Sequence, residues 1–305
     1  MRLRGPRWLY WRFWVQLLAT LVANNGLFQA TKGVCWPGLN CWSCPSAAFG
    51  CPLGALQNSM GAWRWRLAAG SLGAALLALP WYVIGSLLLI GALFGRMVCG
   101  WLCPFGWFQE LLGKLSRRKF TLPRWLAYFR YVILVGLVFV VAFFTGQPWF
   151  CKLCPQGFLE GGLPQPLLRP ELRAGIGWLW YTKLAIFLAV VVASVFFRRP
   201  FCAVGCPLGA IYALMTRYSL WRTVFLADKC TNCLWCVRAC PQGIDPRRDL
   251  DSHLCIGCLE CQKCPFEAIV SVPAWRVPSL LAEHQLEPDS RTGEKDDSAT
   301  SAADG

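Results

Sequence analysis

Eight cysteines near the end of the chain fall into two closely spaced runs. The first run reads C-T-N-C-L-W-C-V-R-A-C-P from Cys230, and the second reads C-I-G-C-L-E-C-Q-K-C-P from Cys255. The spacing Cx2Cx2Cx3CP of the first run is typical of [4Fe–4S] ligation, in which three thiolates bind three irons of one cluster and the fourth cysteine reaches a second cluster. These residues therefore predict one-electron redox chemistry.

Crossed ligation divides the eight thiolates between two sites. The second run closes with Cx2C between Cys261 and Cys264, where three intervening residues are usual, so we expect a local change of geometry there. Zinc sites use one or two CxxC pairs and disulfide scaffolds are small secreted chains, which disfavours both alternatives. The predicted ligand sets are Cys230, Cys233, Cys236 and Cys264 for one cluster, and Cys255, Cys258, Cys261 and Cys240 for the other.

Long apolar segments must position this chemistry. The chain has 305 residues, of which 56% are hydrophobic and 15% charged, whereas soluble domains carry about 25% charged residues. A membrane-spanning helix needs about 20 apolar residues. Arg130 and Lys183 lie near the starts of their segments, where Arg130 can snorkel to the interface. Buried core helices are the alternative; the four predicted spans are Phe13–Ala30, Leu67–Gly95, Trp125–Gly146 and Trp178–Phe197.

The net charge of +14 follows the pattern of a membrane protein and does not indicate nucleic-acid binding. Basic residues are concentrated before the first apolar segment, after the second and after the fourth, as the positive-inside rule requires of cytoplasmic segments. We therefore expect an inner-membrane protein whose two termini are both cytoplasmic. The first segment lacks a small-residue cleavage site after it and is interpreted as a retained anchor.

The other ten cysteines lie near the ends of the apolar segments, and four of them begin the tetrapeptide Cys-Pro-x-Gly. This pattern predicts a duplicated two-helix unit whose halves share one orientation, a parallel repeat. The cytoplasmic ends should then bring four thiols together, and the outer cysteines should converge on the other face. The inner set is Cys99, Cys103, Cys202 and Cys206; the outer set is Cys41, Cys44, Cys51, Cys151 and Cys154, with Cys35 nearby.

Several kinds of chemistry suit these thiols. The inner four are expected to act as one unit that binds a further iron–sulfur centre or another metal. The outer thiols face an oxidising compartment, which favours disulfides, but two of their pairs have the CxxC spacing of metal ligands. The proline of each Cys-Pro-x-Gly sequence favours the first turn of a helix, and a helix N-terminus stabilises a thiolate. The alternative is that Cys-Pro-x-Gly is only a turn that ends a span.

The residues that are missing also restrict the function. The chain has two histidines, His253 and His284, and neither lies in the apolar half. A haem held by two histidines inside the bundle is therefore excluded, as is c-type haem, because no CxxCH occurs. No GxGxxG or Walker A motif indicates nucleotide binding.

With four predicted spans, the inner CxxxCP motifs at Cys99–Pro104 and Cys202–Pro207, and the Cys230–Pro241 run, the chain resembles the NapH/NosR-type membrane ferredoxins over about residues 8 to 270. The resemblance implies an electron-transfer protein of the inner membrane that takes electrons from quinol or exchanges them with a redox partner, as a quinol dehydrogenase component does. Two alternatives are a cluster-dependent maturation or regulatory protein and a thiol-based metal-handling protein. Thiolates favour Cu(I) or zinc.

The expected fold is thus an α-helical membrane protein with a small C-terminal domain of the bacterial 2[4Fe–4S] ferredoxin type. The predicted domains are residues 1–222 for the membrane half, 223–272 for the ferredoxin domain and 273–305 for a polar, disordered tail. The cofactors expected are two [4Fe–4S] clusters, a possible further centre at the membrane-end cysteines, and no haem.

Overall fold

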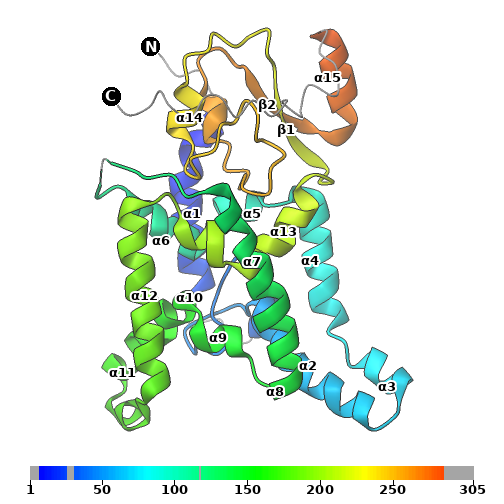
Figure 1. Cartoon of the computed structure of the whole chain (residues 1–305), viewed down its shortest axis with the longest axis vertical. Helices are drawn as coiled ribbons and strands as arrows, with labels where there is room; N and C mark the ends of the chain where they lie inside the picture. Colours follow the sequence, from blue (N-terminus) through cyan, green and yellow to red (C-terminus); the bar gives the residue numbers. More distant parts are fainter. Residues whose placement is uncertain (1–6, 26–30, 117, 285–305) are drawn as a thin grey trace.

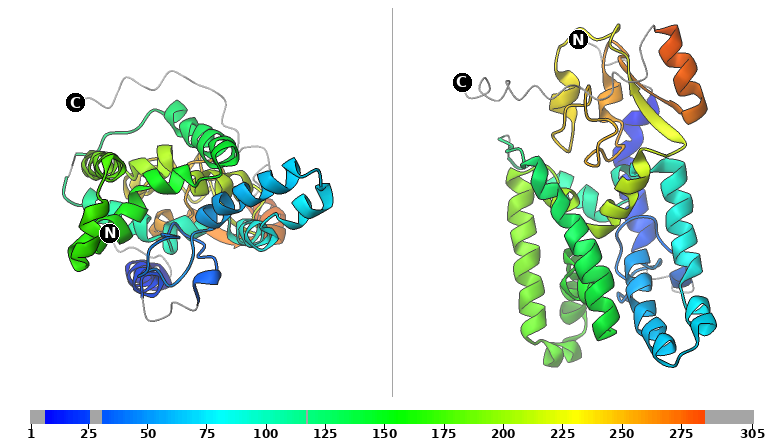
Figure 2. Two further views of the ribbon diagram at one scale, coloured as in Figure 1. Left: turned by 90° about the horizontal axis from the view of Figure 1, so that it is seen from below. Right: turned by 45° about the vertical axis from the view of Figure 1, so that its right-hand side comes forward.

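The computed structural model describes residues 7–25, 31–116 and 118–284. Figure 1 shows a set of helices that run roughly along the long axis, with a smaller part containing β1, β2, α14 and α15 at one end. Short helices lie across the junction between these two parts. Figure 2 shows the same division from a second side, so the iron–sulfur motifs stand at one end of the helical half.

Two helices of the described residues are long and apolar enough to cross a membrane. They are Arg124–Thr145, with mean hydropathy 2.3, and α12, Trp178–Phe196, with mean hydropathy 2.0. Only 28% and 11% of their apolar windows are buried, whereas a core helix of a soluble protein buries most of its surface. Exposed side chains such as Leu188 and Val192 on α12 instead fit contact with lipid. These helices confirm the third and fourth predicted segments to within one residue at each end.

The second predicted span, Leu67–Gly95, is not one helix. It is divided among the end of α2 (Pro52–Ala68), α3 (Leu72–Leu77) and α4 (Trp81–Phe94). Gly70 adopts a positive φ of 73° and Pro80 precedes α4, so a turn and a residue without a backbone N–H interrupt the helix. The 14 residues of α4 extend about 21 Å, less than the ~30 Å of a bilayer core.

The first predicted span is also shorter than expected. Helix η1 covers Arg7–Trp11 and α1 covers Arg12–Ala23, while the end of the predicted segment, residues 26–30, lies outside the described residues. Four continuous membrane helices are therefore not confirmed by this structure. What it supports is a helical chain with two candidate membrane helices.

Short helices form the junction and the opposite end. At the junction lie α5 (Met97–Trp101), α6 (Pro104–Gly113), η7 (Phe201–Gly205) and α13 (Pro207–Thr216). At the opposite end lie α9 (Trp149–Leu153), α10 (Pro155–Gly157), η5 (Phe158–Gly162), α11 (Pro164–Leu168) and η6 (Pro170–Gly175). The long helix before them is built from η3 (Arg124–Tyr128), α7 (Phe129–Val132), a π-helical stretch η4 (Ile133–Val141) and α8 (Ala142–Thr145).

Arg130 on α7 does not snorkel to an interface as expected. Its side chain is fully buried, and its guanidinium donates a hydrogen bond of 2.7 Å to the backbone oxygen of His253 in the C-terminal part. The reason is that α7 packs beneath the ferredoxin segment, which offers a nearer acceptor than water does. This arginine therefore joins the two parts of the molecule.

A two-stranded antiparallel sheet closes the ferredoxin segment. Strand β1 (Trp221–Phe225) pairs with β2 (Ile269–Pro273), and the register places Trp221 opposite Pro273. Between the strands lie α14 (Trp235–Ala239) and η8 (Glu260–Lys263). The sheet thus begins two residues before the predicted boundary at 223 and brings the ends of the segment together.

The start of the predicted disordered tail is structured. Residues beyond β2 form η9 (Ala274–Arg276) and α15 (Val277–Glu283). Val277 and Leu281 are buried against Val224 and Leu226, because apolar residues four positions apart share one face of a helix. The prediction of disorder from residue 273 is therefore wrong as far as His284; residues 285–305 lie outside the described residues.

Candidate iron–sulfur and thiol sites

The two cysteine runs of the ferredoxin segment have matching backbones. The residues on either side of the second cysteine of each run have positive φ: Asn232 and Leu234 around Cys233, and Gly257 and Leu259 around Cys258. A leucine in this left-handed region costs about 1–2 kcal/mol. Such strain persists where a site requires a particular backbone. The same turn in both runs is therefore part of how the thiols are positioned.

The shorter spacing of the second run is absorbed by its helical turn. The first run uses the five-residue α-helix α14 before Cys240, and the second uses the four-residue 3₁₀ helix η8 before Cys264. Because a 3₁₀ helix rises about 2.0 Å per residue and an α-helix about 1.5 Å, both turns advance roughly 8 Å. Cys240 and Cys264, which follow these turns, have similar backbone angles. The expected change of geometry is therefore confined to the helical turn before Cys264.

One of the two predicted ligand sets of the ferredoxin segment is brought together as crossed ligation requires. The pKa of Cys258 is raised to about 12, mainly by burial, with Arg12 opposing the rise and Cys240 and Cys255 adding to it. Burial also raises the pKa of Cys261, and Cys258, Cys255 and Cys240 are its next strongest influences. Cys240 from the first run therefore lies with Cys255, Cys258 and Cys261 from the second.

The other set is less completely defined. Burial raises the pKa of Cys236 to about 11, with Asp245 adding to it and Cys264 also contributing. Arg247 lies near both Cys236 and Cys230. The backbone oxygen of Cys233 accepts a hydrogen bond from Arg238, and its thiol shows no contact with this set among the described residues. The structure thus associates Cys230, Cys236 and Cys264.

These donors fit iron–sulfur clusters. No three His, Cys, Asp or Glu side chains in the described ranges converge as ligands of a single metal ion. The four thiolates of a cluster each bind a different iron and so stand farther apart. Thiols with raised pKa values stay protonated at neutral pH unless a metal displaces the proton. Most of these cysteines are buried, and although Asp245 lies near Cys236, each predicted ligand set consists of cysteines alone, which suits clusters held only by cysteine.

The four Cys-Pro-x-Gly sequences all begin helices in one way. Each cysteine has extended backbone angles, and each following proline is the first helical residue, of α2, α6, α10 and α13. The Sγ atom of Cys206 accepts a hydrogen bond of 3.4 Å from the backbone N–H of Gly209. The tetrapeptide is therefore a helix start, and at Cys206 the sulfur takes the place of the usual oxygen cap.

The glycine of each inner tetrapeptide makes room for an arginine from the other half of the chain. A Cβ on Gly106 would lie 3.0 Å from Arg199, and a Cβ on Gly209 would lie 3.1 Å from Arg96. Arg199 donates to the backbone oxygen of Cys99 at 3.0 Å, and Arg96 donates to that of Cys202 at 3.3 Å. Arg96 and Arg199 are 103 positions apart, as are Cys99 and Cys202. The two halves therefore exchange equivalent arginines.

The inner thiol group, Cys99, Cys103, Cys202 and Cys206, lies between those halves. The pKa of Cys103 is raised to about 12, first by burial and then by Cys202 and Cys99. Burial raises the pKa of Cys206 as well, followed by the effects of the other three thiols. Gln109 on α6 donates to the Sγ atom of Cys202 at 3.2 Å. The structure thus brings together the four inner cysteines that the duplication predicts.

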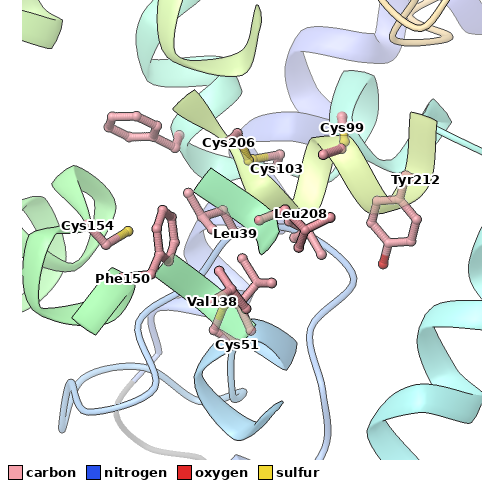
Figure 3. Close-up of a cluster of buried hydrophobic side chains, with 14 of the residues drawn as sticks. Leu39, Cys51, Cys99, Cys103, Val138, Phe150, Cys154, Cys206, Leu208 and Tyr212 are labelled. Atoms are coloured by element: carbon pink, nitrogen blue, oxygen red, sulfur yellow. The ribbon is translucent and has the colours of Figure 1, made fainter. Parts of the chain in front are cut away.

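The outer thiol group, Cys41, Cys44, Cys51, Cys151 and Cys154, lies on the other side of the core. Figure 3 shows Cys51 and Cys154 separated from Cys99, Cys103 and Cys206 by Leu39, Val138 and Leu208. The pKa of Cys154 is raised to about 11 by burial, and Cys51 from the first half adds to it. A cavity of about 520 Å³ borders the group and is lined by four of its cysteines and by Trp42, Trp180 and Lys183.

The outer cysteines form no disulfides, because all eighteen cysteines are free thiols. Cys44 donates a hydrogen bond of 3.1 Å to the backbone oxygen of Glu160. The side chain of Glu160 is buried, which raises the pKa of this carboxyl to about 8, and Cys44 adds to the rise. The disulfides that an oxidising face favours are thus not present in this structure.

The inner thiol group packs directly against the ferredoxin segment. A Cβ on Gly100 would lie 2.8 Å from the backbone oxygen of Ile256 and 2.9 Å from the Cα atom of Cys258. In return, a Cβ on Gly257 would lie 3.0 Å from the Cα atom of Met97. Two glycines therefore allow the loop of one thiol group to touch the loop of the next.

A buried ion-pair network holds the same junction. Arg12 on α1 contacts Glu110 on α6 at 2.5 Å and Glu260 on η8 at 3.1 Å, and Arg199 contacts Glu110 at 2.7 Å. Burial opposes the ionisation of Glu110, but Arg199 and Arg12 outweigh it and lower its pKa. Sequence reasoning treated these arginines only as topology signals. The recurrence of Arg-x-x-Cys at Arg199 and at Arg96, the equivalent position of the first half, could have identified Arg199.

Comparison with known proteins assigns the chain to a family. A family described as "4Fe-4S binding domain" matches residues 76–123, 126–166 and 179–226, and a second family with the same description matches residues 223–244. The three matches of the first family contain Cys99 and Cys103, Cys151 and Cys154, and Cys202 and Cys206. The chain belongs to the NapH/NosR-type 4Fe-4S ferredoxin family. Three of its four Cys-Pro-x-Gly helix starts, at Cys103, Cys154 and Cys206, thus lie within the matched segments.

Relatives of this NapH/NosR-type chain occur in archaea and bacteria. The uncharacterized protein MJ0750 of Methanocaldococcus jannaschii is 29% identical over 66% of this chain and 79% of its own length. The putative electron transport protein YccM of Escherichia coli is 26% identical over 86% of this chain and 69% of its own length. The regulatory protein NosR of Pseudomonas aeruginosa is 30% identical over 67% of this chain.

The chain covers only 28% of the length of that NosR, so the similarity concerns one part of a longer protein. No solved structure matches the chain. What the family and the two cysteine-rich parts establish together is an iron–sulfur protein of the electron-transfer type, with ferredoxin-type domains.

Proposed function

We propose that this chain moves electrons between the quinone pool and a redox partner protein, through a membrane-embedded half and a ferredoxin segment. Two [4Fe–4S] clusters in the ferredoxin segment would supply the one-electron chemistry, one held by Cys230, Cys233, Cys236 and Cys264 and the other by Cys240, Cys255, Cys258 and Cys261. The chain itself positions these thiols, buries most of them and links them to the helical half.

The observation that carries the proposal is the contact between Gly100 and the Cys255–Cys258 loop. A distance of 2.9 Å from a Cβ on Gly100 to the Cα atom of Cys258 means that the two backbones are in van der Waals contact. An exposed electron-transfer domain tethered by a flexible linker would need no such contact. A close, rigid junction is what transfer between the two parts requires.

Four membrane spans with both termini in the cytoplasm belong to the same proposal. The distribution of basic residues supports this topology. Exposed apolar side chains on α1 and α4, among them Leu18, Leu21, Leu88 and Leu89, support lipid contact beyond the two longest helices. Short helices can be accommodated by local thinning of the bilayer at a modest free-energy cost.

Quinone-dependent redox change of the clusters tests the function. The purified protein is reconstituted in lipid vesicles, and its visible and electron paramagnetic resonance spectra are followed as a quinol analogue and then the matching quinone are added. A stoichiometric and reversible change in cluster oxidation state is expected. Clusters that exchange electrons with soluble donors but with no quinone would contradict the proposed role.

A second candidate is a maturation or regulatory protein for a metalloenzyme. The name of the relative NosR, a regulatory protein, favours this alternative. The outer thiol group and its cavity also suit the handling of a soft metal such as Cu(I). Transfer of copper or zinc from the purified chain to an acceptor, without any change in cluster oxidation state, would favour these candidates.

A further inference from the structure

Buried arginines are concentrated around the inner thiol group. Arg96, Arg130 and Arg199 are at most 2% exposed and are the three largest fully buried side chains described. A guanidinium keeps its charge in proteins, and an isolated buried charge costs several kcal/mol. Three such groups in one place therefore require negative charge nearby.

Most hydrogen bonds of these arginines go to backbone oxygens, so carboxylates compensate little of their positive charge. Arg96 and Arg130 both donate to the backbone oxygen of His253. Arg199 contacts Glu110, but Glu110 is shared with Arg12. Buried nitrogen atoms without a hydrogen-bond partner among the described residues are Nε of Arg96, Nε and Nη1 of Arg130, and Nε of Arg199.

The inner thiols are the groups that these guanidiniums approach. Arg96 reaches from the first half to the backbone oxygen of Cys202, and Arg199 reaches from the second half to that of Cys99. Arg130 lies near both Arg96 and Cys206. If all four thiols were protonated, they would not balance this charge. Four thiolates on a metal centre would.

A cluster fits the site better than a single ion does. Four thiolates leave either centre negative, so charge alone does not decide between them. The thiols of the described residues do not converge as ligands of one metal ion do, and a cluster needs thiolates spread around its irons. The site also touches a ferredoxin loop through Gly100 and Cys258, a position that suits a redox centre.

We propose that Cys99, Cys103, Cys202 and Cys206 hold a third iron–sulfur cluster, shared between the two repeats, and that Arg96, Arg130 and Arg199 compensate its negative charge. The inference deepens the proposed electron-transfer function and rests on it for its purpose. It makes Arg96 and Arg199 positioning residues, because each reaches from one half to the thiol pair of the other and so fixes the two pairs relative to each other.

The arginines should also set the reduction potential of this cluster. Reduction adds one negative charge, and fixed positive charges in a buried site of low dielectric constant favour the more negative state. The inner cluster should therefore be reduced at a higher potential than it would be without them. Removing one charge should shift the potential of this cluster and leave the ferredoxin clusters nearly unchanged.

The metal and sulfide content of the purified protein tests whether the inner thiols hold a cluster. Cys202→Ser is prepared in the full chain, with Cys151→Ser in the outer thiol group as the matched control, and iron, sulfide, copper and zinc are measured. The proposal expects Cys202→Ser to lose one cluster's iron and sulfide and to keep both ferredoxin signals. Unchanged iron and sulfide in Cys202→Ser would overturn it, and so would zinc or copper bound to the inner thiols of the wild-type protein.

The role of the arginines is tested by redox titration followed by electron paramagnetic resonance. Arg199→Gln and Arg96→Gln should move the midpoint of the inner signal to a more negative potential. Arg199→Lys keeps the charge, so its midpoint should lie close to the wild-type value. Arg66→Gln, which removes an exposed charge, should not change the midpoint. Equal midpoints in the Gln, Lys and wild-type proteins would overturn charge compensation, as would the loss of the signal in Arg199→Lys as complete as in Cys202→Ser.

These measurements need neither quinone nor partner. If a third cluster is present and its potential responds to the arginines, but no quinone changes its oxidation state, the proposed function fails and the site remains. If quinones reduce the ferredoxin clusters while the inner thiols bind no iron, the function remains and this inference fails.

Discussion

At the residue scale, the spacing of the cysteines predicts the iron–sulfur chemistry but does not reveal the buried arginines around the inner thiols. The eight ferredoxin cysteines can be assigned to two sets because three thiolates per run and a crossed fourth are a fixed requirement of the motif. The structure gathers Cys240 with Cys255, Cys258 and Cys261 as that assignment expects.

Single substitutions test the two ligand sets. Cys233→Ser should remove one cluster and Cys258→Ser the other, because each removes a thiolate from a different set. Electron paramagnetic resonance of each variant should show the signal of one ferredoxin cluster lost and that of the other retained. A folded variant in which either change abolished both signals would contradict independent ligand sets.

A second substitution tests the ion-pair network at the junction. Glu110→Gln leaves Arg12 and Arg199 buried with less compensating charge, and breaking a buried pair in this way costs about 3–5 kcal/mol. The thermal midpoint of the helical half should therefore fall by several degrees, as followed by circular dichroism. Glu171→Gln, an exposed change of the same type, should leave it unchanged; an equal effect from both would mean that the network contributes little.

The burial of the three arginines around the inner thiol group is not predictable from the sequence, although two of them share the motif Arg-x-x-Cys. Arg96, Arg130 and Arg199 read as cytoplasmic charge at the ends of apolar segments, and that pattern is the same whether a side chain points to water or inward. Only the packing of α7 and η7 under the ferredoxin segment decides the direction. Their burial is thus a tertiary property, whereas the cysteine sets are a local one.

At the element scale, apolar composition predicts the long uninterrupted helices but not the turns that divide a helix. Trp125–Gly146 and Trp178–Phe197 were predicted within one residue because their ends are marked by glycine, proline or arginine. Leu67–Gly95 has the same apolar composition, but the turn at Gly70 and the proline at position 80 divide it. The sequence did not predict helix α15, because its apolar face holds only a few residues. The residues that it packs against, in and just after β1, are also distant in the sequence.

Topology is tested by reporter fusions. Fusions after residues 60 and 165 should report the periplasm and a fusion after residue 290 the cytoplasm, because basic residues are concentrated on the opposite side from the first two sites. The activities of alkaline phosphatase and a cytoplasmic reporter, compared at each position, give the result. A periplasmic signal at 290 would place the ferredoxin segment on the wrong side and reverse the topology.

At the scale of the whole molecule, the repeat explains why chemistry recurs at both ends of the helical half. Cys51 and Cys154 are separated by the same 103 positions as Cys103 and Cys206, so each pair comes from equivalent points of the two halves. Bringing the halves together gives a thiol group at each end, and only the inner one meets the ferredoxin segment. The repeated tetrapeptide predicts the pairing, but not which loops touch.

The central claim is that electrons pass between the helical half and the ferredoxin segment at the contact of Gly100 with Cys258. Gly100→Ala should push the two backbones apart, because its Cβ would lie 2.8 Å from the oxygen of Ile256, and overpacking of this kind costs about 1–3 kcal/mol. The control is Gly85→Ala in α4, whose Cβ would meet nothing within 4 Å.

The deciding measurement is the rate at which a quinol analogue reduces the ferredoxin clusters in lipid vesicles, followed by stopped-flow absorbance. The account predicts that Gly100→Ala slows this reduction several-fold while a soluble reductant still reduces its clusters at the wild-type rate, and that Gly85→Ala behaves as wild type. Quinol-driven reduction that is equally fast in Gly100→Ala, Gly85→Ala and the wild-type protein would contradict it.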